Sequence, residues 1–237
     1  MKKLVIILFM LLLVKAAFAQ LNADGGPNVF VGSLGIHQTF MNNQPFNSWA
    51  LSNYNKKFYQ ATGGQVELSY FDKQFDYGLH ISGYGSFITA YAYIGKRLTS
   101  VHSKISSYLN LDFGDLAFDR SDIVPPGYVR TPDQQGKDLK LEYGMNYMGL
   151  TTTNFLNSMN FHFGKHKKIS FNTGFYATVA YNVFNDRYWK YGYDDNANST
   201  TDGDGGVNIP FNSVTIHNIP LLNRFFVEAG IFAGIGN

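Results

Sequence analysis

The sequence predicts an all-β protein, an eight-stranded antiparallel transmembrane β-barrel, with ten strands as the alternative count. The first observation behind this prediction is the alternation within residues 169–184. This period of two lasts far longer than the roughly 5–6 residues of an ordinary soluble strand. A strand with one apolar face and one small or polar face suits the wall of a barrel in lipid. The odd positions are Ile169, Phe171, Thr173, Phe175, Ala177, Val179, Tyr181 and Val183.

The second observation is an N-terminus with the pattern of a secretory signal peptide. A basic start at Lys2 and Lys3 is followed by an apolar block over residues 4–14 and by the small-x-small site at residues 17–19. A transmembrane anchor is the alternative, but the block is short and Lys15 interrupts it. We therefore expect a signal peptide at residues 1–19 and one barrel domain over residues 20–237.

Composition and charge are the third observation. The chain has no cysteine, 24 glycines, 16% aromatic residues and 45% hydrophobic residues. Such modest hydrophobicity is compatible with a membrane barrel, because only alternate residues of each strand face lipid. Residues 1–19 contain three of the 19 basic residues and no acid, so 16 basic residues remain against 17 acidic ones. The resulting charge of about −1 gives no reason to expect nucleic-acid binding.

The strands follow from where the alternation starts and stops. Long polar loops are expected at residues 41–62, with a helical turn at 49–53, at 119–137 and at 185–210. Residues 212–219 are expected to extend the return arm of the third loop. The eight strands are predicted at residues 29–40, 64–72, 76–84, 86–96, 105–117, 138–163, 169–184 and 224–237.

Two of these assignments depend on the phase of the alternation. The apolar positions are odd from Tyr77 to Ile81 but even from Ile88 to Ile94. This change indicates a turn at residues 83–86, and a single bulged strand is the alternative. By contrast, the phase is unbroken through residues 138–163, which favours one long strand there.

The strand count also determines on which side of the membrane each loop lies. With the first strand rising, the three long loops lie on the outer side of the membrane. The short turns at residues 73–75, 97–104 and 164–167 lie on the periplasmic side, as is typical of bacterial barrels. Splitting residues 138–163 and fusing residues 76–96 also gives eight strands, but it would put residues 119–137 on the periplasmic side.

Three segments resemble the small outer-membrane β-barrel proteins of Bacteroidota-type bacteria. They are residues 29–37 (VFVGSLGIH), residues 63–70 (GGQVELSY) and residues 225–236 (FFVEAGIFAGIG). The resemblance implies a barrel in the outer membrane of a Gram-negative cell, reached by export through the periplasm. It carries over no catalytic residue. The chain departs from many such barrels by ending in Asn237 instead of an aromatic residue.

The only catalytic candidates are His80 and Ser82, which share one face of a predicted strand. They resemble the His-x-Ser pair of small barrel lipid A deacylases, in which histidine could activate the hydroxyl. A third, orienting carboxylate would be needed, and the sequence does not identify it. The alternative is a hydrogen-bonded pair inside the barrel. We expect that the chain is not an enzyme.

Charged and polar residues are predicted to face the interior of the barrel. An eight-stranded barrel is just wide enough for side chains to fill it, so these groups should form a satisfied polar plug. A proton or ion path is the alternative. The predicted inward residues include Glu67, Asp112, Lys140, Glu142, Asn160, His162, Asn172 and Glu228.

The loop at residues 185–210 contains two further candidate sites. Its carboxylates Asp194, Asp195, Asp202 and Asp204 could hold calcium through hard oxygen ligands, although the EF-hand pattern is absent and a solvated acidic loop is the default. Its aromatic residues should meet lipid headgroups and lipopolysaccharide phosphates with the help of Arg187 and Lys190, or else bind a partner protein. These residues are Tyr188, Trp189, Tyr191 and Tyr193.

The sequence therefore favours a structural or interaction role in the outer membrane. The outer loops at residues 41–62, 119–137 and 185–210 would contact another outer-membrane or surface protein or the cell surface, and no cofactor is required. A lipid A-modifying enzyme and a narrow channel are the alternative functions. A soluble lipocalin-like barrel, apolar inside and polar outside, is the alternative structure.

Overall fold

The computed structural model describes residues 29–71, 74–100, 105–163, 167–184, 186–201 and 207–236. The predicted signal peptide at residues 1–19 lies outside these residues. Eight antiparallel strands close into a barrel in the order β1-β2-β3-β4-β5-β6-β7-β12, and β12 pairs back with β1. These strands are β1 (Val29–Phe40), β2 (Thr62–Phe71), β3 (Phe75–Tyr84), β4 (Phe87–Arg97), β5 (Ser106–Arg120), β6 (Lys140–Phe163), β7 (Lys167–Tyr181) and β12 (Phe225–Gly236).

The barrel confirms the predicted fold class and the count of eight. The turn between β3 and β4 and the single long strand β6 are also as predicted. The ten-stranded barrel is wrong, because the two further strands of the sheet lie outside the closed ring. They are β8 (Tyr188–Asp194) and β11 (Phe211–Ile216), which pair with each other.

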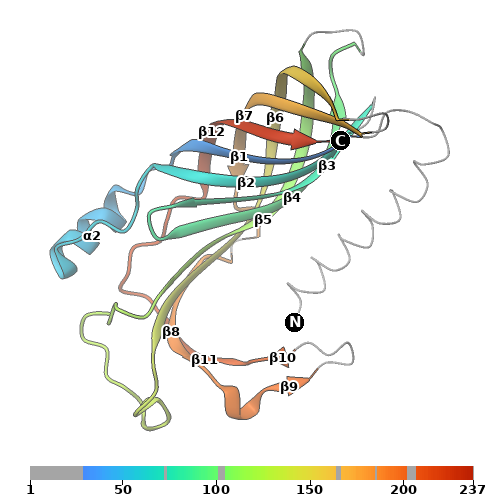
Figure 1. The fold of residues 1–237 in the computed structure, drawn as a ribbon. Coiled ribbons are helices and arrows are strands. Elements are labelled where there is room, and N and C mark those ends of the chain that lie inside the picture. The colour runs from blue at the N-terminus through green and yellow to red at the C-terminus, as the bar shows by residue number, and fades with distance from the viewer. Residues whose placement is uncertain are drawn as a thin grey trace.

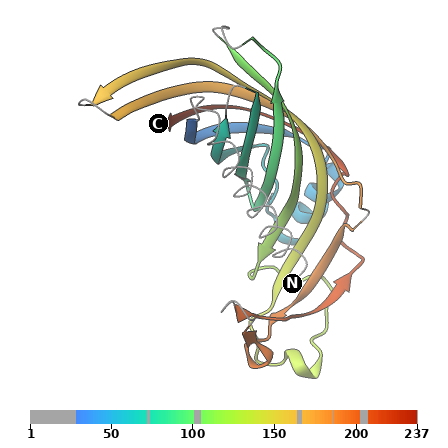
Figure 2. The ribbon, with the colours of Figure 1, turned by 90° about the vertical axis from the view of Figure 1, so that its right-hand side faces the viewer.

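The strand β6 joins the barrel to this outside hairpin. Residues 148–163 of β6 pair with β7, whereas residues 140–144 pair with β8. On its other edge β6 pairs with β5 over residues 141–155. The sheet therefore continues past the rim of the barrel along β5 and β6 and curves as it does so (Figure 2).

The helix α2 (Gln44–Tyr54) lies at the same end of the barrel as the β8–β11 hairpin (Figure 1). It begins with Pro45 in its first turn, where a missing backbone N–H costs nothing. It ends at Asn55, whose φ of 52° closes the helix in the left-handed conformation. The helix is longer than the predicted turn at residues 49–53. No helix among the described residues is long and apolar enough to span a membrane.

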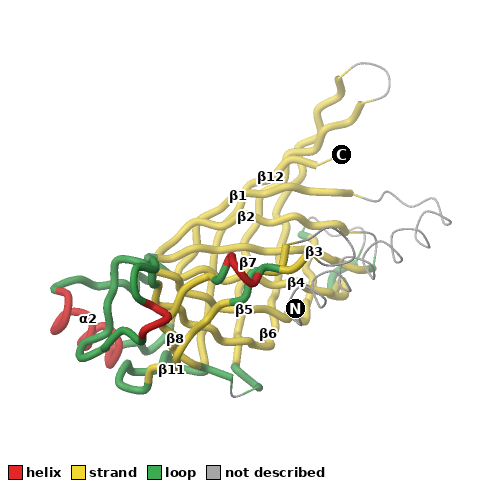
Figure 3. Tube along the Cα trace, turned by 90° about the horizontal axis from the view of Figure 1, so that it is seen from below, coloured by secondary structure: helices red, strands yellow, loops and turns green. Residues whose placement is uncertain are grey.

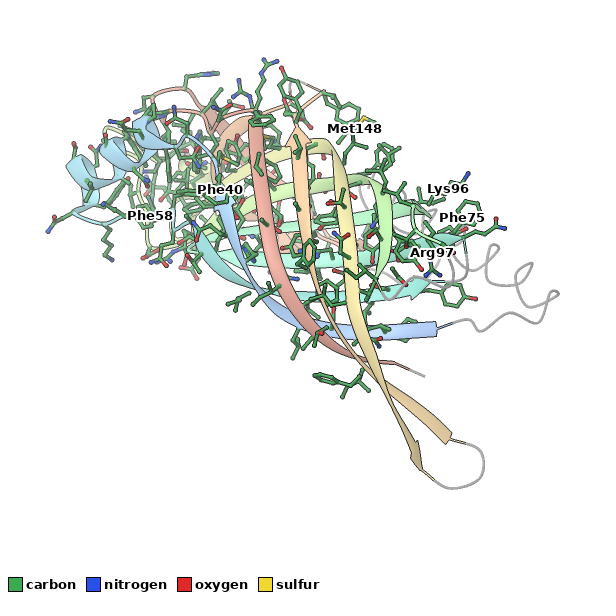
Figure 4. All side chains as sticks on the ribbon, turned by 90° about the horizontal axis from the view of Figure 1, so that it is seen from above. Phe40, Phe58, Phe75, Lys96, Arg97 and Met148 are labelled. Atoms are coloured by element: carbon green, nitrogen blue, oxygen red, sulfur yellow. The ribbon has the colours of Figure 1, made fainter. Side chains whose placement is uncertain are left out.

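The same end carries most of the chain outside the barrel (Figure 3). Besides α2 and the hairpin, it holds residues 121–139 with the short helix η1 (Pro132–Gln134), and the segment between β8 and β11. That segment contains η2 (Asn196–Asn198), β9 (Thr200–Thr201) and β10 (Val207–Asn208). We call α2, residues 121–139 and β8 through β11 the α2-end assembly. In Figure 4, Phe58 lies near α2, whereas Phe75, Lys96 and Arg97 lie at the opposite end.

The prediction of a loop over residues 185–210 is wrong for β8. Trp189, Tyr191 and Tyr193 alternate with Lys190 and Gly192, which is a strand pattern. These residues have a high strand propensity, and they form a strand because the protruding part of β6 offers a free edge for pairing. The aspartates and asparagines that follow Tyr193 made the whole stretch resemble a loop.

Large apolar side chains point outward around the barrel, as predicted for most strands. Leu34 is 66% exposed on β1 and Ile231 is 59% exposed on β12. The outward set extends over the other walls with Val66, Leu68, Ile81, Ile88, Ile94, Leu109, Leu111, Leu150, Phe175, Val179, Phe225 and Ile235. On β12, Phe226 and Phe232 point inward instead, and the sequence position of Phe232 indicated this orientation.

On β6 the predicted orientation is reversed. Tyr143, Met145 and Tyr147 are buried inside, and Leu150 is exposed. The prediction treated the aromatic face as the outer one. The interior near α2 is itself aromatic, so the more apolar face of this strand is the inner one. A bulge near residues 155–157 then interrupts the register of β6 with β7.

Candidate functional site

Three layers fill the barrel from the α2 end to the opposite end. Buried aromatic residues form the first layer, and a hydrogen-bonded polar network forms the second. The third layer is a small aromatic cluster of Tyr108, Phe155, Tyr176 and Phe232. It lies toward the opposite end, since Phe155 pairs with the first residue of β5.

Glu228 of β12 is the centre of the polar layer. Its carboxylate accepts hydrogen bonds from Tyr176 on β7 at 2.7 Å, from Ser82 on β3 at 3.2 Å and from Thr39 on β1 at 3.3 Å. The Nε2 atom of His80 lies 3.5 Å from Oε1 of Glu228. One buried carboxylate therefore links four strands across the lumen.

His80 lies between two carboxylates. Its Nδ1 atom is 3.3 Å from Oε2 of Glu67, opposite the Nε2 contact with Glu228. Two carboxylates on opposite sides of the ring favour its cationic, imidazolium form. Glu67 also accepts from Ser69 and Tyr93 at 2.6 Å each, and the His80 ring stacks on Tyr91 with centroids 4.4 Å apart.

The predicted pair His80 and Ser82 lies inside the barrel, with both side chains buried. Ser82 shares a short hydrogen bond with Thr89 and donates to Glu228. Glu228 thus stands between the serine and the histidine. A nucleophilic triad needs the histidine in the middle, hydrogen-bonded to the hydroxyl. The geometry therefore corresponds to the alternative that we gave for this pair, a hydrogen-bonded group in the lumen.

The polar layer contains two more buried carboxyls, those of Asp76 and Asp112. Asp76 accepts from the amide of Asn110 at 3.2 Å, and Asp112 accepts from Thr151 at 2.5 Å. Several buried polar atoms here lack a protein partner within the described residues, among them an oxygen of each aspartate.

The predicted inward residues divide into three groups. Glu67, Asp112, Asn172 and Glu228 are buried, as expected. Lys140 and Glu142 are not in the lumen, because the even-numbered positions of β6 face outward, as the exposed Leu150 shows, and these two lie beyond the barrel rim. The side chains of Asn160 and His162 lie outside the described residues. The remaining partners Tyr176 and Tyr93 were missed because they look like ordinary strand residues in the sequence.

Trp189 is the centre of the aromatic layer beneath α2. It is 0% exposed, and its ring stacks on Phe46 of the helix with centroids 5.2 Å apart. Phe118 and Tyr143 contact it from β5 and β6 at 5.4 and 4.8 Å. Its indole nitrogen donates to the carbonyl of Pro220 at 3.1 Å. The helix, the hairpin and the rim of the barrel therefore share one hydrophobic core.

The other aromatic residues of β8 have different surroundings. Tyr191 and Tyr193 are buried, and Tyr191 contacts Tyr128 of residues 121–139. Tyr188 is half-buried, with the ammonium of Lys190 4.5 Å from its ring centroid. Contact of this aromatic group with lipid headgroups or a partner protein stays a prediction.

The four calcium candidates do not form one group in the described residues. Asp194 forms an ion pair with Lys140 at 3.0 Å, and Lys140 also contacts Asp119 and Glu142. Asp195 accepts hydrogen bonds from Asn198 and Asn212. Asp202 and Asp204 lie outside the described residues. In the part of the chain that the structure covers, no three His, Cys, Asp or Glu side chains gather in a metal-binding arrangement.

Acidification is expected to loosen the turn at Asp195. The hydrogen bond from Asn198 holds the pKa of this carboxyl below its usual value of 3.8. A carboxyl with a depressed pKa in the folded state stabilises the fold above its unfolded pKa and loses this effect as the pH falls through the folded value. The stabilisation is thus complete at neutral pH and is lost below about pH 4. Side-chain amide resonances of Asn198 and Asn212 should report the change.

The variant Asp195→Asn is the control for this pH dependence. It removes the titrating group, so its amide resonances should lack the acid transition. Resonances of the wild type that stay constant from neutral pH down to a pH well below 3.8 would contradict the prediction.

No protein-family model matches this chain, and no curated protein matches it at a significant level. The geometry described above is therefore the basis of the functional assignment.

Proposed function

We propose that this protein is an outer-membrane β-barrel that presents the α2-end assembly to a partner or to the cell surface. The observation that carries the proposal is the distribution of polarity across the barrel wall. Side chains such as Leu34, Ile36 and Ile231 cover the outside, whereas Glu67, Glu228 and other polar groups fill the inside. A soluble barrel would require the reverse.

Closure of the barrel supports the same conclusion. In lipid every backbone N–H and C=O must find its partner within the protein. The ladder from β1 through β7 and β12 returns to β1, so the ring has no free edge. Eight strands also agree with the even strand number of bacterial outer-membrane barrels.

The filled lumen favours a contact role over transport. One aromatic layer lies on each side of the polar network along the barrel axis. The helix α2 covers the aromatic layer at the α2 end. An eight-stranded barrel leaves space for side chains but little for a solute. The chain therefore has its accessible chemistry at the ends of the barrel.

The α2-end assembly has the features of a contact surface. Val129 is 83% exposed, and Leu51 of α2 and Val124 of the same assembly are also exposed. Exposed apolar side chains surrounded by polar residues are typical of interaction sites. Their support is rigid, because Trp189 anchors the assembly to the barrel rim.

Single-cysteine labelling tests the location of each surface, since the chain has no cysteine of its own. Phe175→Cys and Ile231→Cys lie on the outer wall, and an environment-sensitive bimane there should be quenched by lipid-soluble quenchers. Val129→Cys should instead react with a membrane-impermeant maleimide on intact cells. The physical reason is that apolar outward positions face acyl chains, whereas the α2 end faces water.

The matched control is Ser82→Cys, whose side chain points into the lumen and should remain unreactive to both reagents. Reaction of the cysteines at positions 175 and 231 with the impermeant maleimide would overturn the membrane assignment. A cysteine at position 129 that reacts only after the outer membrane is opened would reverse the proposed orientation.

A further inference from the structure

A polar pocket lies at the tip of the α2-end assembly, between η1 and the β8–β11 hairpin. Its volume is about 480 Å³, within the range of roughly 300–1,000 Å³ that is usual for small-ligand sites. Three segments that are distant in sequence form its walls. The polar lining includes Asp133, Gln134, Asp195, Asn198, Asn212 and Ser213.

Asp195 organises one wall of this pocket. It is only 6% exposed, and its two oxygens accept from the backbone of Ala197 and from the side-chain amides of Asn198 and Asn212. The amide of Asn212 also lies 3.3 Å from the hydroxyl of Tyr193. Both amides are thereby fixed through their nitrogens, which leaves their carbonyl oxygens as acceptors for a ligand.

Gln134 organises the opposite wall. It is buried, and its side-chain oxygen accepts from the hydroxyl of Tyr128 at 2.6 Å and from the backbone of Thr131 at 3.2 Å. The guanidinium of Arg130 donates to the backbone carbonyl of Gln134 at 3.2 Å. These bonds fix the short helix that carries Asp133. Within the described ranges, no hydrogen bond or ion pair engages the Asp133 carboxylate.

The chemistry of the pocket selects a ligand with several hydroxyl groups. A free carboxylate and fixed amide oxygens accept hydrogen bonds, whereas the remaining amide N–H groups donate. A sugar ring offers both donors and acceptors on adjacent carbons, and Val214 offers an apolar contact for its C–H groups. A bare cation would leave the donors unused.

We propose that this pocket binds one sugar unit of a cell-surface glycan, such as the oligosaccharide of lipopolysaccharide. This inference rests on the proposed function, because only the α2 end facing outward would bring the pocket near such a glycan. It names the chemical class of the surface partner. The pocket also gives a role to the β8–β11 hairpin, which the closed barrel does not need.

Calorimetric titration of the full chain tests the proposal. The protein is purified in a detergent without a sugar headgroup. The probes are the core oligosaccharide released from lipopolysaccharide by mild acid, and the methyl glycosides of glucose, galactose and mannose. We expect saturable binding of at least one probe. Asp133→Asn and Asn212→Leu should each weaken it about ten-fold or more, because each removes an acceptor and the leucine also fills the pocket.

Two matched variants control for indirect effects. Asp138→Asn changes an exposed carboxylate of the same loop, and Thr215→Leu changes β11 outside the pocket lining. Both should bind as the wild type does. Asp133→Asn changes an exposed side chain and is expected to fold, so its result is decisive even if Asn212→Leu fails to fold.

Three outcomes would overturn the inference: no saturable binding of any of these probes, equal weakening by the control variants, or pocket variants that change calcium binding alone. Binding to purified protein does not depend on location, so it can fail while the cysteine labelling still supports the membrane assignment. Conversely, failure of the labelling with intact sugar binding would reject the location and keep the pocket.

Discussion

Replacing Glu228 by alanine is expected to lower the free energy of unfolding by about 3–5 kcal/mol. The change removes the acceptor shared by Tyr176, Ser82 and Thr39 and one of the two carboxylates beside His80. These donors stay buried without a partner, and a buried charge that loses its partner is strongly destabilising. Urea titration of the protein refolded in lipid vesicles, followed by heat-modifiable gel mobility, measures the loss.

Two variants make this result specific. Glu228→Gln keeps the shape and one acceptor oxygen and should lose less stability than the alanine variant. Glu142→Gln removes a carboxylate of the ion-pair group around Lys140 beyond the barrel rim, where about 1 kcal/mol or less is expected. If the Glu228→Ala variant unfolded at the wild-type urea concentration, the polar layer would not stabilise the barrel.

Replacing Trp189 by alanine is expected to release the α2-end assembly while the barrel stays closed. The ring contacts Phe46, Phe118 and Tyr143, and deletion of a fully buried tryptophan typically costs about 3–5 kcal/mol. The barrel ladder does not include β8, so the loss should act on local opening of the assembly. Trypsin cleavage at Arg187 or Lys190 should become about 100-fold faster or more.

The control for this prediction is Trp49→Ala. Trp49 is only half-buried on α2 and stacks on Phe46 from the outer side, so its loss should accelerate cleavage far less. Heat-modifiable mobility of both variants should remain that of the wild type. A Trp189→Ala variant that loses the folded gel form would show that the assembly and the barrel unfold as one unit.

Most of the barrel could be predicted because its walls follow a simple physical pattern. The outward residues Ile36, Phe175 and Ile231 occur with a period of two, and the phase change between Ile81 and Ile88 marks the turn of β3 into β4. Periodicity identifies two faces but not which of them is inside. On β6 the aromatic face fills the lumen under α2, and the predicted orientation was therefore wrong.

The site could be predicted only in part. The sequence placed His80 and Ser82 on one face, and the structure buries both in the lumen. Their shared partner, Glu228, is 146 positions after Ser82, and it is reached across the lumen because the stagger of β12 against β1 brings it level with Thr39. Such stagger depends on the pairing of all eight strands, and one local pattern does not contain it.

The hairpin β8–β11 could not be derived from its own residues alone. Its pairing edge is created by residues 140–144 of β6, which extend beyond the end of β7. The Tyr and Trp residues of β8 also fit a membrane girdle, and Asp194 and Asp195 fit a calcium loop. The hairpin forms because β6 is long enough to extend beyond β7. The sequence indicated the length of β6 but not that β8 would pair with its protruding residues.

The length of β6 has a mechanical consequence. At about 3.3 Å per residue its 24 residues span about 80 Å, more than twice what a strand tilted by about 45° needs to cross an apolar band of about 25 Å. In the proposed location the same backbone would pass through the membrane and continue into the α2-end assembly. A force applied to the hairpin would be carried along a continuous hydrogen-bonded ladder, and the ladder would hold the proposed glycan pocket at a fixed height and angle above the bilayer.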